Sequence, residues 1–113
     1  MVLELNEYVR TKNGIIAKVI GVQSGGIEKY YFDKEVIDNF KELTQIGTEN
    51  VVLKHSFNIV DLIEKGDFIN GQRVEEKHKD GIFLENMQSF YKEKEIETIL
   101  TKEQFEAMEY EVK

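Results

Sequence analysis

The sequence contains no cysteine, no proline and only two histidines. Without cysteine the chain can form neither a disulfide nor a thiolate ligand, which is consistent with a reducing compartment. Two histidines are too few for an ordinary zinc site, and no calcium loop of alternating acids is present. No glycine-rich phosphate-binding motif is present either. We therefore expect neither a metal nor a cofactor.

Long apolar runs are also missing. No run approaches the ~18 residues that a membrane-spanning helix needs. Residues 1–10 lack a basic stretch followed by an apolar one, as a signal peptide would have. The sequence therefore predicts no signal peptide, no membrane association and a cytoplasmic location.

The sequence also lacks basic clusters, because no three basic residues are adjacent in it. The chain has 22 acidic and 15 basic residues, which gives a net charge of −7. Nucleic-acid binders need a basic face to neutralise phosphates, so the composition predicts no direct nucleic-acid binding. An acidic surface either fits a protein partner with a basic surface or only keeps the chain in solution.

The positive features begin with hairpins. A chain of 113 residues is long enough for a single domain, 1–113, with one core. Most glycines fall between apolar runs. The pattern predicts strands over Tyr8–Thr11, Ile15–Val22 and Ile27–Phe32, with a turn at Asn13-Gly14 between the first two. Asn-Gly is a strong hairpin signal because both residues tolerate positive φ.

A second hairpin is predicted where Asn70-Gly71 follows Phe68-Ile69, and a further turn at Asp80-Gly81 leads into a strand over Ile82–Leu84. We expect positive φ at Asn70 and Gly71, and a role in folding rather than in ligand binding. The two Asn-Gly hairpins share the order aromatic, β-branched, Asn-Gly. Either an internal duplication or reuse of one turn chemistry explains this order.

Helical signals are few. Val36, Ile37, Phe40 and Leu43 recur at helical spacing and favour a helix over Asp33–Leu43, with a loop as the alternative. The string NVVLKHS predicts a brief strand. Ser56 or Asn58 can cap a single helical turn that ends before Gly66.

The C-terminal part shows the clearest local signals. It predicts a strand over Ile96–Leu100, a helix from Lys102 to about Met108, and a last strand in Tyr110–Val112. Thr101 and Gln104 have the spacing of a capping box at the start of that helix. The fold class expected is mainly β, α+β at the margin. The architecture is a small partly open barrel or two small antiparallel sheets of hairpins, with one or two short helices.

Catalysis finds no support in the sequence. His55, Ser56 and Asp61 bring an imidazole, a hydroxyl and a carboxylate close in sequence, but no nucleophile-elbow motif accompanies them. We expect His55 and Ser56 to bond backbone groups at a chain reversal, and the protein not to be an enzyme.

Aromatic and acidic residues are the candidate binding groups. Tyr30, Tyr31 and Phe32 are consecutive, so at least one ring faces away from the core of an alternating strand. The candidate binding residues are Tyr30, Tyr31, Phe90, Tyr91, Glu93, Glu95 and Glu97, followed by the acids Glu103, Glu106 and Glu109. On a strand Ile96–Leu100, Glu95 and Glu97 should share one face. The alternative is that these acids only solubilise the chain.

Three strings cover most of the chain: VRTKNGIIAKVIGV, VVLKHSFNIVDLIEKGDFINGQRV and IETILTKEQFEAMEYEV. They resemble a family of small uncharacterised proteins from phages and prophages of clostridia and related low-GC Gram-positive bacteria. Glu35–Asn50 and Lys77–Glu95 match this pattern poorly. The resemblance implies an accessory protein of a mobile element and brings no catalytic residue with it.

Two function classes follow. In the first, a phage-encoded protein inhibits a host or bacterial-immunity protein, as an anti-CRISPR does, by presenting acidic and aromatic surface to a basic groove. In the second, the protein sequesters a small molecule such as a nucleotide signal in a pocket between strands or protomers. The expected suppliers of that pocket are Arg10, Lys18, Arg73, Tyr30 and Tyr31. A homodimer is compatible with both.

Overall fold

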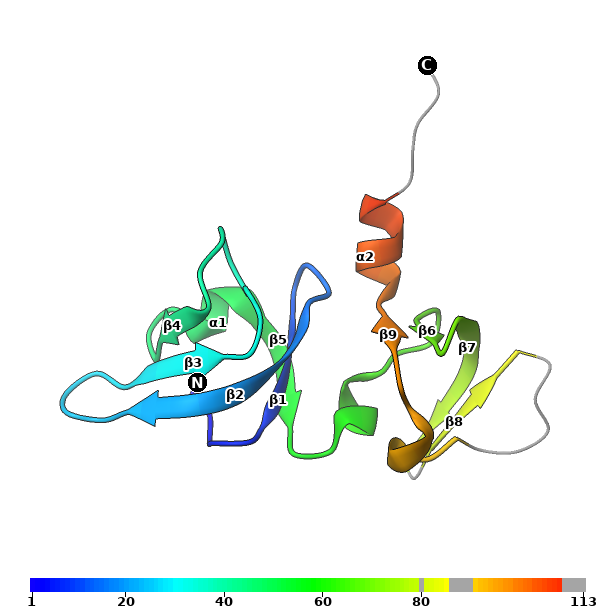
Figure 1. Ribbon diagram of the computed structural model, residues 1–113, viewed down its shortest axis with the longest axis horizontal. Helices are drawn as coiled ribbons and strands as arrows, with labels where there is room; N and C mark the ends of the chain where they lie inside the picture. The colour runs from blue at the N-terminus through cyan, green and yellow to red at the C-terminus, as the bar shows by residue number, and fades with distance from the viewer. Residues whose placement is uncertain (80, 86–90, 109–113) are drawn as a thin grey trace, which may run out of the picture. The chain divides into compact units, whose positions relative to one another are not determined.

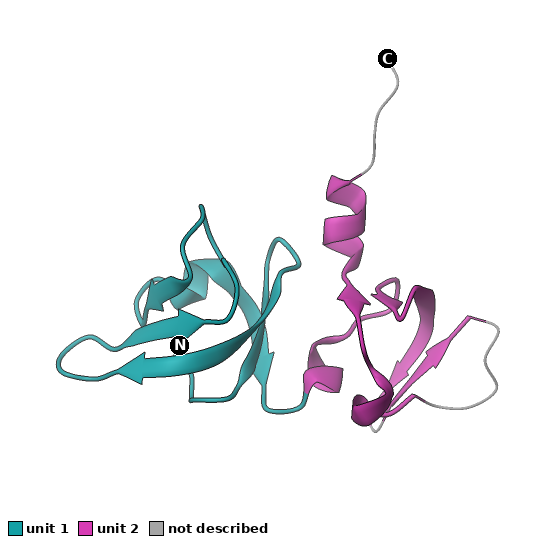
Figure 2. Ribbon diagram, viewed as in Figure 1, with its two compact units in different colours: residues 1–58 teal, residues 59–113 magenta. Residues whose placement is uncertain are grey.

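The computed structural model describes residues 1–79, 81–85 and 91–108. Contacts within the chain divide it into two compact units, Met1–Asn58 and Ile59–Lys113 (Figure 2), and each is described by itself. Each unit has its own cluster of buried apolar side chains. The expectation of one core was therefore wrong, because each sheet closes its own apolar side chains into a separate cluster. The assignment of 1–113 to a single domain stays a prediction.

Unit 1 is an antiparallel half-barrel of five strands in the order β4-β3-β2-β1-β5 (Figure 1). The strands are β1 (Tyr8–Thr11), β2 (Ile16–Gln23), β3 (Lys29–Phe32), β4 (Glu42–Thr44) and β5 (Val52–Ser56). Alternation along the strands places Val9, Val19 and Phe32 in the core. The predicted three-strand meander is confirmed, with β1 at the expected bounds and a glycine turn of positive φ at Gly14.

The segment predicted as a helix over Asp33–Leu43 contains no helix, and its last residues belong to β4. It is instead a loop with a tight turn at Asp38 and Asn39, whose φ angles are 44° and 70°. Asp and Asn adopt this left-handed conformation more readily than other side-chain-bearing residues. The turn pairs Ile37 with Phe40. The turn brings these two apolar residues together without a helix, so their helical spacing predicted the wrong structure.

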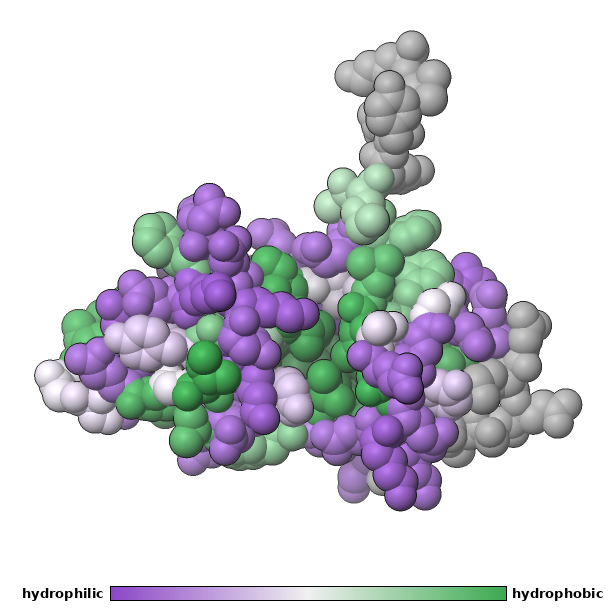
Figure 3. Space-filling model, in the orientation of Figure 1, coloured by the Kyte–Doolittle hydropathy of each residue, from purple (hydrophilic) through white to green (hydrophobic). Residues whose placement is uncertain are grey.

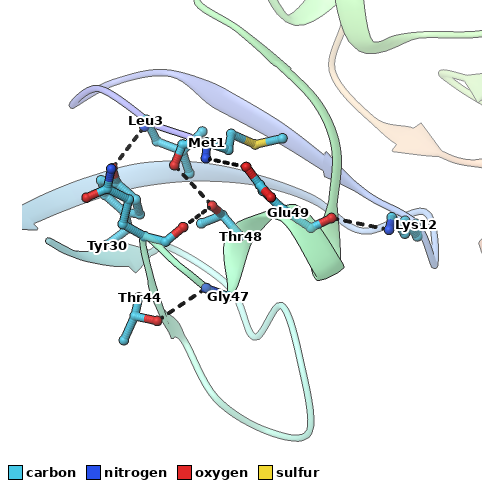
Figure 4. A network of polar contacts seen from close by, with 9 residues as sticks. Met1, Leu3, Lys12, Tyr30, Thr44, Gly47, Thr48 and Glu49 are labelled. Carbon is cyan, nitrogen blue, oxygen red and sulfur yellow. Dashed lines mark hydrogen bonds and ion pairs between the residues drawn. The ribbon is translucent and has the colours of Figure 1, made fainter. Parts of the chain in front are cut away.

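A short helix, α1 (Thr48–Val51), links β4 to β5 and was not expected from the sequence. Figure 4 shows how polar contacts join it to the N-terminal segment. The Thr48 hydroxyl lies 3.2 Å from the Met1 carbonyl oxygen and 2.8 Å from that of Gln45. The Met1 amine contacts the Glu49 carboxylate at 3.0 Å. A helix of one turn is too short to give a periodic signal, so its position depends on these contacts.

Unit 2 is a four-stranded antiparallel sheet in the order β8-β7-β6-β9. Its strands are β6 (Phe68–Ile69), β7 (Gln72–His78), β8 (Gly81–Leu84) and β9 (Ile99–Leu100); its helices are the 3-10 turns η1 (Ile59–Leu62) and η2 (Glu93–Glu95) and the α-helix α2 (Lys102–Ala107). Val60, Ile63, Ile69, Val74, Ile82 and Leu84 form its core. The predicted helical turn before Gly66 is confirmed as η1.

The turn at Asn70-Gly71 is confirmed, with φ angles of 51° and 82°. The Asn70 side chain also contacts the segment that leads into β9. Its Oδ1 accepts the amides of Glu97 (2.8 Å) and Thr98 (3.0 Å), and its Nδ2 donates to the Glu95 carbonyl (2.9 Å). These bonds take the place of strand pairing.

The strand predicted over Ile96–Leu100 is consequently reduced to Ile99–Leu100, and Glu95 lies in η2 instead of sharing a strand face with Glu97. The helix that follows is confirmed as α2, with the Thr101 hydroxyl accepting the Gln104 amide at 3.3 Å. The predicted strand Tyr110–Val112 lies outside the described residues. The protein is mainly β, with two small antiparallel sheets and few short helices, as the sequence predicted.

Candidate functional site

Tyr30 and Tyr31 lie on opposite faces of β3. Tyr30 is fully buried. Its hydroxyl accepts the Leu3 amide at 3.0 Å and donates to the Glu28 carboxylate at 2.9 Å. Burial raises the pKa of the Tyr30 phenol above its ordinary 10.0, because the charged form loses its hydration. The Tyr30 ring has no exposed surface and holds the N-terminal segment. Its burial argues against the binding role that was expected for Tyr30.

Tyr31 points to the outer face of the unit 1 sheet, as the alternation argument requires. We call this surface the Tyr–Lys face and define it by Tyr8, Lys18, Ile20, Tyr31 and Lys29. The Lys18 ammonium lies 5.6 Å from the centre of the Tyr8 ring, and the Lys29 ammonium 5.8 Å from that of Tyr31. Both are cation–π distances. The Tyr–Lys face therefore combines aromatic and cationic groups within a chain of negative net charge.

A shallow pocket of about 370 Å³ lies in unit 1 and is lined by Met1, Ile27, Gln45, Ile46 and Glu49. Its lining contains one carboxylate, that of Glu49, which is paired with the Met1 ammonium at 3.0 Å, and no lysine or arginine. The lining therefore offers an anionic nucleotide no cation beyond this ion pair.

The residues expected to supply a nucleotide pocket are not gathered there. Arg10 is fully buried in β1, and Arg73 lies in unit 2, where its guanidinium contacts Glu75 at 3.4 Å. Of the five, only Lys18 and Tyr31 share a surface, the Tyr–Lys face.

Two buried acids have structural roles. Glu7 accepts the Glu4 amide at 2.7 Å through one oxygen, and the other lies 2.7 Å from His55 Nδ1. Asp67 accepts the amides of Glu64 (2.7 Å) and Lys102 (2.9 Å), and so joins the loop before β6 to the start of α2. Charge-assisted hydrogen bonds of this kind are strong, so the two carboxylates fix neighbouring parts of the chain.

The predicted contacts of His55 and Ser56 are only partly as expected. The Ser56 hydroxyl accepts a backbone amide, that of Asn58, at 3.1 Å. His55, however, contacts the Glu7 side chain.

The predicted acidic group is exposed at Glu93, Glu95 and Glu97. Tyr91 is half-buried, pairs with Ile82 and packs against the unit 2 core. Phe90 and Glu109 lie outside the described residues. The structure thus places the three acids on the surface, while Tyr91 has a packing role.

Sequence reasoning missed a second aromatic group in unit 2. Phe105 of α2 lies against Phe68 of β6, with ring centres 4.8 Å apart, yet 51% of it stays exposed. Met108, one residue after α2, is 73% exposed. Hydrophobic side chains are visible over α2 in Figure 3. The sequence placed Phe105 on a helix, but its partner Phe68 lies far away in the chain, so no local pattern indicates the pair.

The same helix carries two acids, Glu103 two residues before Phe105 and Glu106 one residue after it. We call the group Phe68, Phe105, Met108, Glu103 and Glu106 the aromatic–acidic ridge. The helix carrying it is held by Lys102, whose ammonium lies 2.8 Å from the Glu64 carboxylate. This hydrogen bond raises the pKa of Lys102 above its ordinary 10.5, because it favours the charged form.

Charge is divided unequally between the units. Unit 1 has seven basic and eight acidic residues, whereas unit 2 has eight basic and fourteen acidic residues. Nearly all of the net negative charge therefore belongs to the unit that carries the aromatic–acidic ridge.

Within the described ranges, no group of three or more His, Cys, Asp or Glu residues is placed to hold a metal ion. In the same part of the chain, no helix is long and apolar enough to cross a membrane. No family model, curated protein or solved structure matches this chain.

Proposed function

We propose that this protein is a non-catalytic, phage-encoded cytoplasmic binder that inhibits a host or bacterial-immunity protein. The observation that carries the proposal is the half-exposed Phe105 ring on Phe68, on a helix that also carries Glu103 and Glu106. Aromatic residues are enriched at the cores of protein interfaces, where a few anchors carry most of the binding energy. The phage setting comes from the resemblance of the sequence, and the inhibitory role from that setting.

The partner surface is basic. Fourteen acids in unit 2 favour approach of a cationic surface, and the exposed Glu93 and Glu97 extend the acidic segment toward the Asn70 turn. Charges at the rim of an interface mainly raise the association rate, while the aromatic pair slows dissociation. The alternative, capture of a nucleotide in a pocket between strands, gains no support from the unit 1 pocket, because the Met1 ammonium there is already paired with Glu49.

The test begins with a pull-down from host lysate with the full chain, and mass spectrometry to identify the partner. Affinity for that partner is then measured for two matched variants. Glu93→Lys with Glu97→Lys reverses two exposed acids of unit 2, and Glu4→Lys with Glu35→Lys reverses two of unit 1. Phe105→Ala removes the aromatic anchor.

We expect the unit 2 reversal and Phe105→Ala each to weaken binding about tenfold or more, and the unit 1 reversal to leave it nearly unchanged. Binding should also weaken with added salt, because the Debye length is ~8 Å at physiological ionic strength. The partner's activity should fall with the wild type and recover with Phe105→Ala. Equal affinity for all variants, without salt dependence, would rule out the aromatic–acidic ridge and the acids of unit 2 as the partner-binding surface.

A further inference from the structure

The Tyr–Lys face of unit 1 has a geometry that the proposed function does not use. Tyr8 pairs directly with Lys18 across β1 and β2, and Tyr31 pairs with Gly21 across β2 and β3. Residues that face each other in register lie on one side of a sheet. Both rings and both lysines therefore lie on the outer side of the same sheet, opposite the core.

The Tyr31 ring is held in place before any ligand arrives. Tyr31 lies over Gly21, where a Cβ atom would stand 3.5 Å from its ring, and its hydroxyl donates to Gln23 at 2.7 Å. The register shift of β2 between Val19 and Gly21 leaves Ile20 as the extra residue, 56% exposed. Such a bulge redirects side chains at a strand surface. The result is a fixed aromatic platform with an apolar neighbour.

The net charge of −7 predicted that the chain does not bind nucleic acid directly, but this charge is divided unequally between the two units. Unit 1 has seven basic residues against eight acidic ones, so repulsion of phosphate by net negative charge concerns mainly unit 2. On the Tyr–Lys face, Lys29 lies 3.3 Å from the Glu42 carboxylate, and both side chains are partly exposed. Exposed ion pairs contribute little, so a phosphate can replace Glu42.

We propose that the Tyr–Lys face binds a nucleotide group, with a base stacked on a tyrosine ring and a phosphate held by Lys18 or Lys29. Stacking of a base on an aromatic ring is worth more than an exposed cation–π contact. A base can therefore displace a lysine from its ring, and the released ammonium lies close enough to meet the phosphate. The same chemistry occurs in a free nucleotide and in single-stranded nucleic acid.

The experiment uses the full chain with two probes, a fluorescein-labelled single-stranded DNA oligonucleotide of mixed sequence and AMP. Binding is followed by fluorescence anisotropy and by tyrosine fluorescence. Lys18→Gln with Lys29→Gln tests the cations. Lys34→Gln with Lys41→Gln is the matched control, because it removes the same charge from exposed positions of unit 1. Tyr31→Leu and Tyr31→Phe test stacking.

We expect removal of the Lys18 and Lys29 charges to weaken binding about tenfold and to reduce the salt slope by about 0.7 for each phosphate that the protein no longer neutralises. Tyr31→Leu should weaken it about tenfold and Tyr31→Phe hardly at all. Preference for the oligonucleotide or for AMP identifies the source. Absence of binding to both probes at low salt overturns the proposal. So does an equally weakened affinity in the Lys34 and Lys41 control, which is decisive even if Tyr31→Leu fails to fold.

Discussion

Asn70 and Gly71 form a tight turn and also fix the position of the segment before β9. Both adopt positive φ, which few other residues do at low cost. The Asn70 side chain then fixes the segment before β9 through its bonds to Glu95, Glu97 and Thr98. Both polar atoms of this side chain bond other parts of the protein, which supports a folding role for the turn.

We predict that Gly71→Val lowers the free energy of unfolding by about 1 kcal/mol or more. Nothing lies within 4 Å of a Cβ atom at Gly71, so the penalty arises from its φ of 82° and not from a clash. Gly71→Asn is the control, because Asn tolerates this conformation, and it should be nearly neutral. Urea denaturation measures both. A Gly71→Val protein that keeps its stability but loses its partner would make the turn a recognition element.

At the scale of elements, the N-terminal segment is attached to the half-barrel through one buried phenol and α1. The Tyr30 hydroxyl accepts the Leu3 amide, and Thr48 of α1 bonds the Met1 carbonyl (Figure 4). The end of the segment also bonds the backbone of β2, where the Asn6 amide donates to the Val19 carbonyl at 2.9 Å. Its order depends on these polar contacts and on the burial of Leu3.

We predict that unit 1 loses stability above pH 10 through Tyr30. The folded-state pKa of Tyr30 lies above its ordinary 10.0, so its contribution to stability is complete below pH 10 and is lost as the pH rises through the folded-state pKa. Tyr30→Phe should show a shallower fall in urea midpoint over this range than the wild type. Tyr31→Phe, which changes a partly exposed ring, should follow the wild type. Parallel curves for Tyr30→Phe and the wild type would contradict the assignment.

For the whole molecule, the division into two cores is the main feature. Nine buried residues form the unit 1 core and six form that of unit 2, and the two sets share no member. The charges are divided as well, with the excess of acids in unit 2. Partner-binding and nucleotide-binding proposals therefore fall on different units, and either can fail without the other.

We predict that a core substitution in one unit leaves the other folded. Val9→Ala and Val74→Ala are a matched pair, because each removes two methyl groups from a fully buried strand residue. Each should lower the stability of its own unit by about 1–3 kcal/mol. Hydrogen exchange resolved by residue should show the decrease in protection confined to that unit. An equal decrease in both units would establish 1–113 as one cooperative domain.

The sequence by itself determined the features that depend on neighbouring residues. The turn at Asn70-Gly71, the Thr101 cap of α2 and the exposure of at least one ring among Tyr30–Phe32 were all predicted, because positive φ, capping and strand alternation are local properties. The mainly β class followed from the number of such signals.

Only the tertiary structure decided which apolar residues meet. It showed that Ile37 and Phe40 pair across a turn, that Asn70 holds the segment before β9, and that Phe105 stacks on Phe68. It also showed two separate cores. The two units differ in net charge, which the composition of the whole chain does not show. The reason is physical: periodicity gives the direction of a side chain, but its partner depends on contacts between residues distant in the chain.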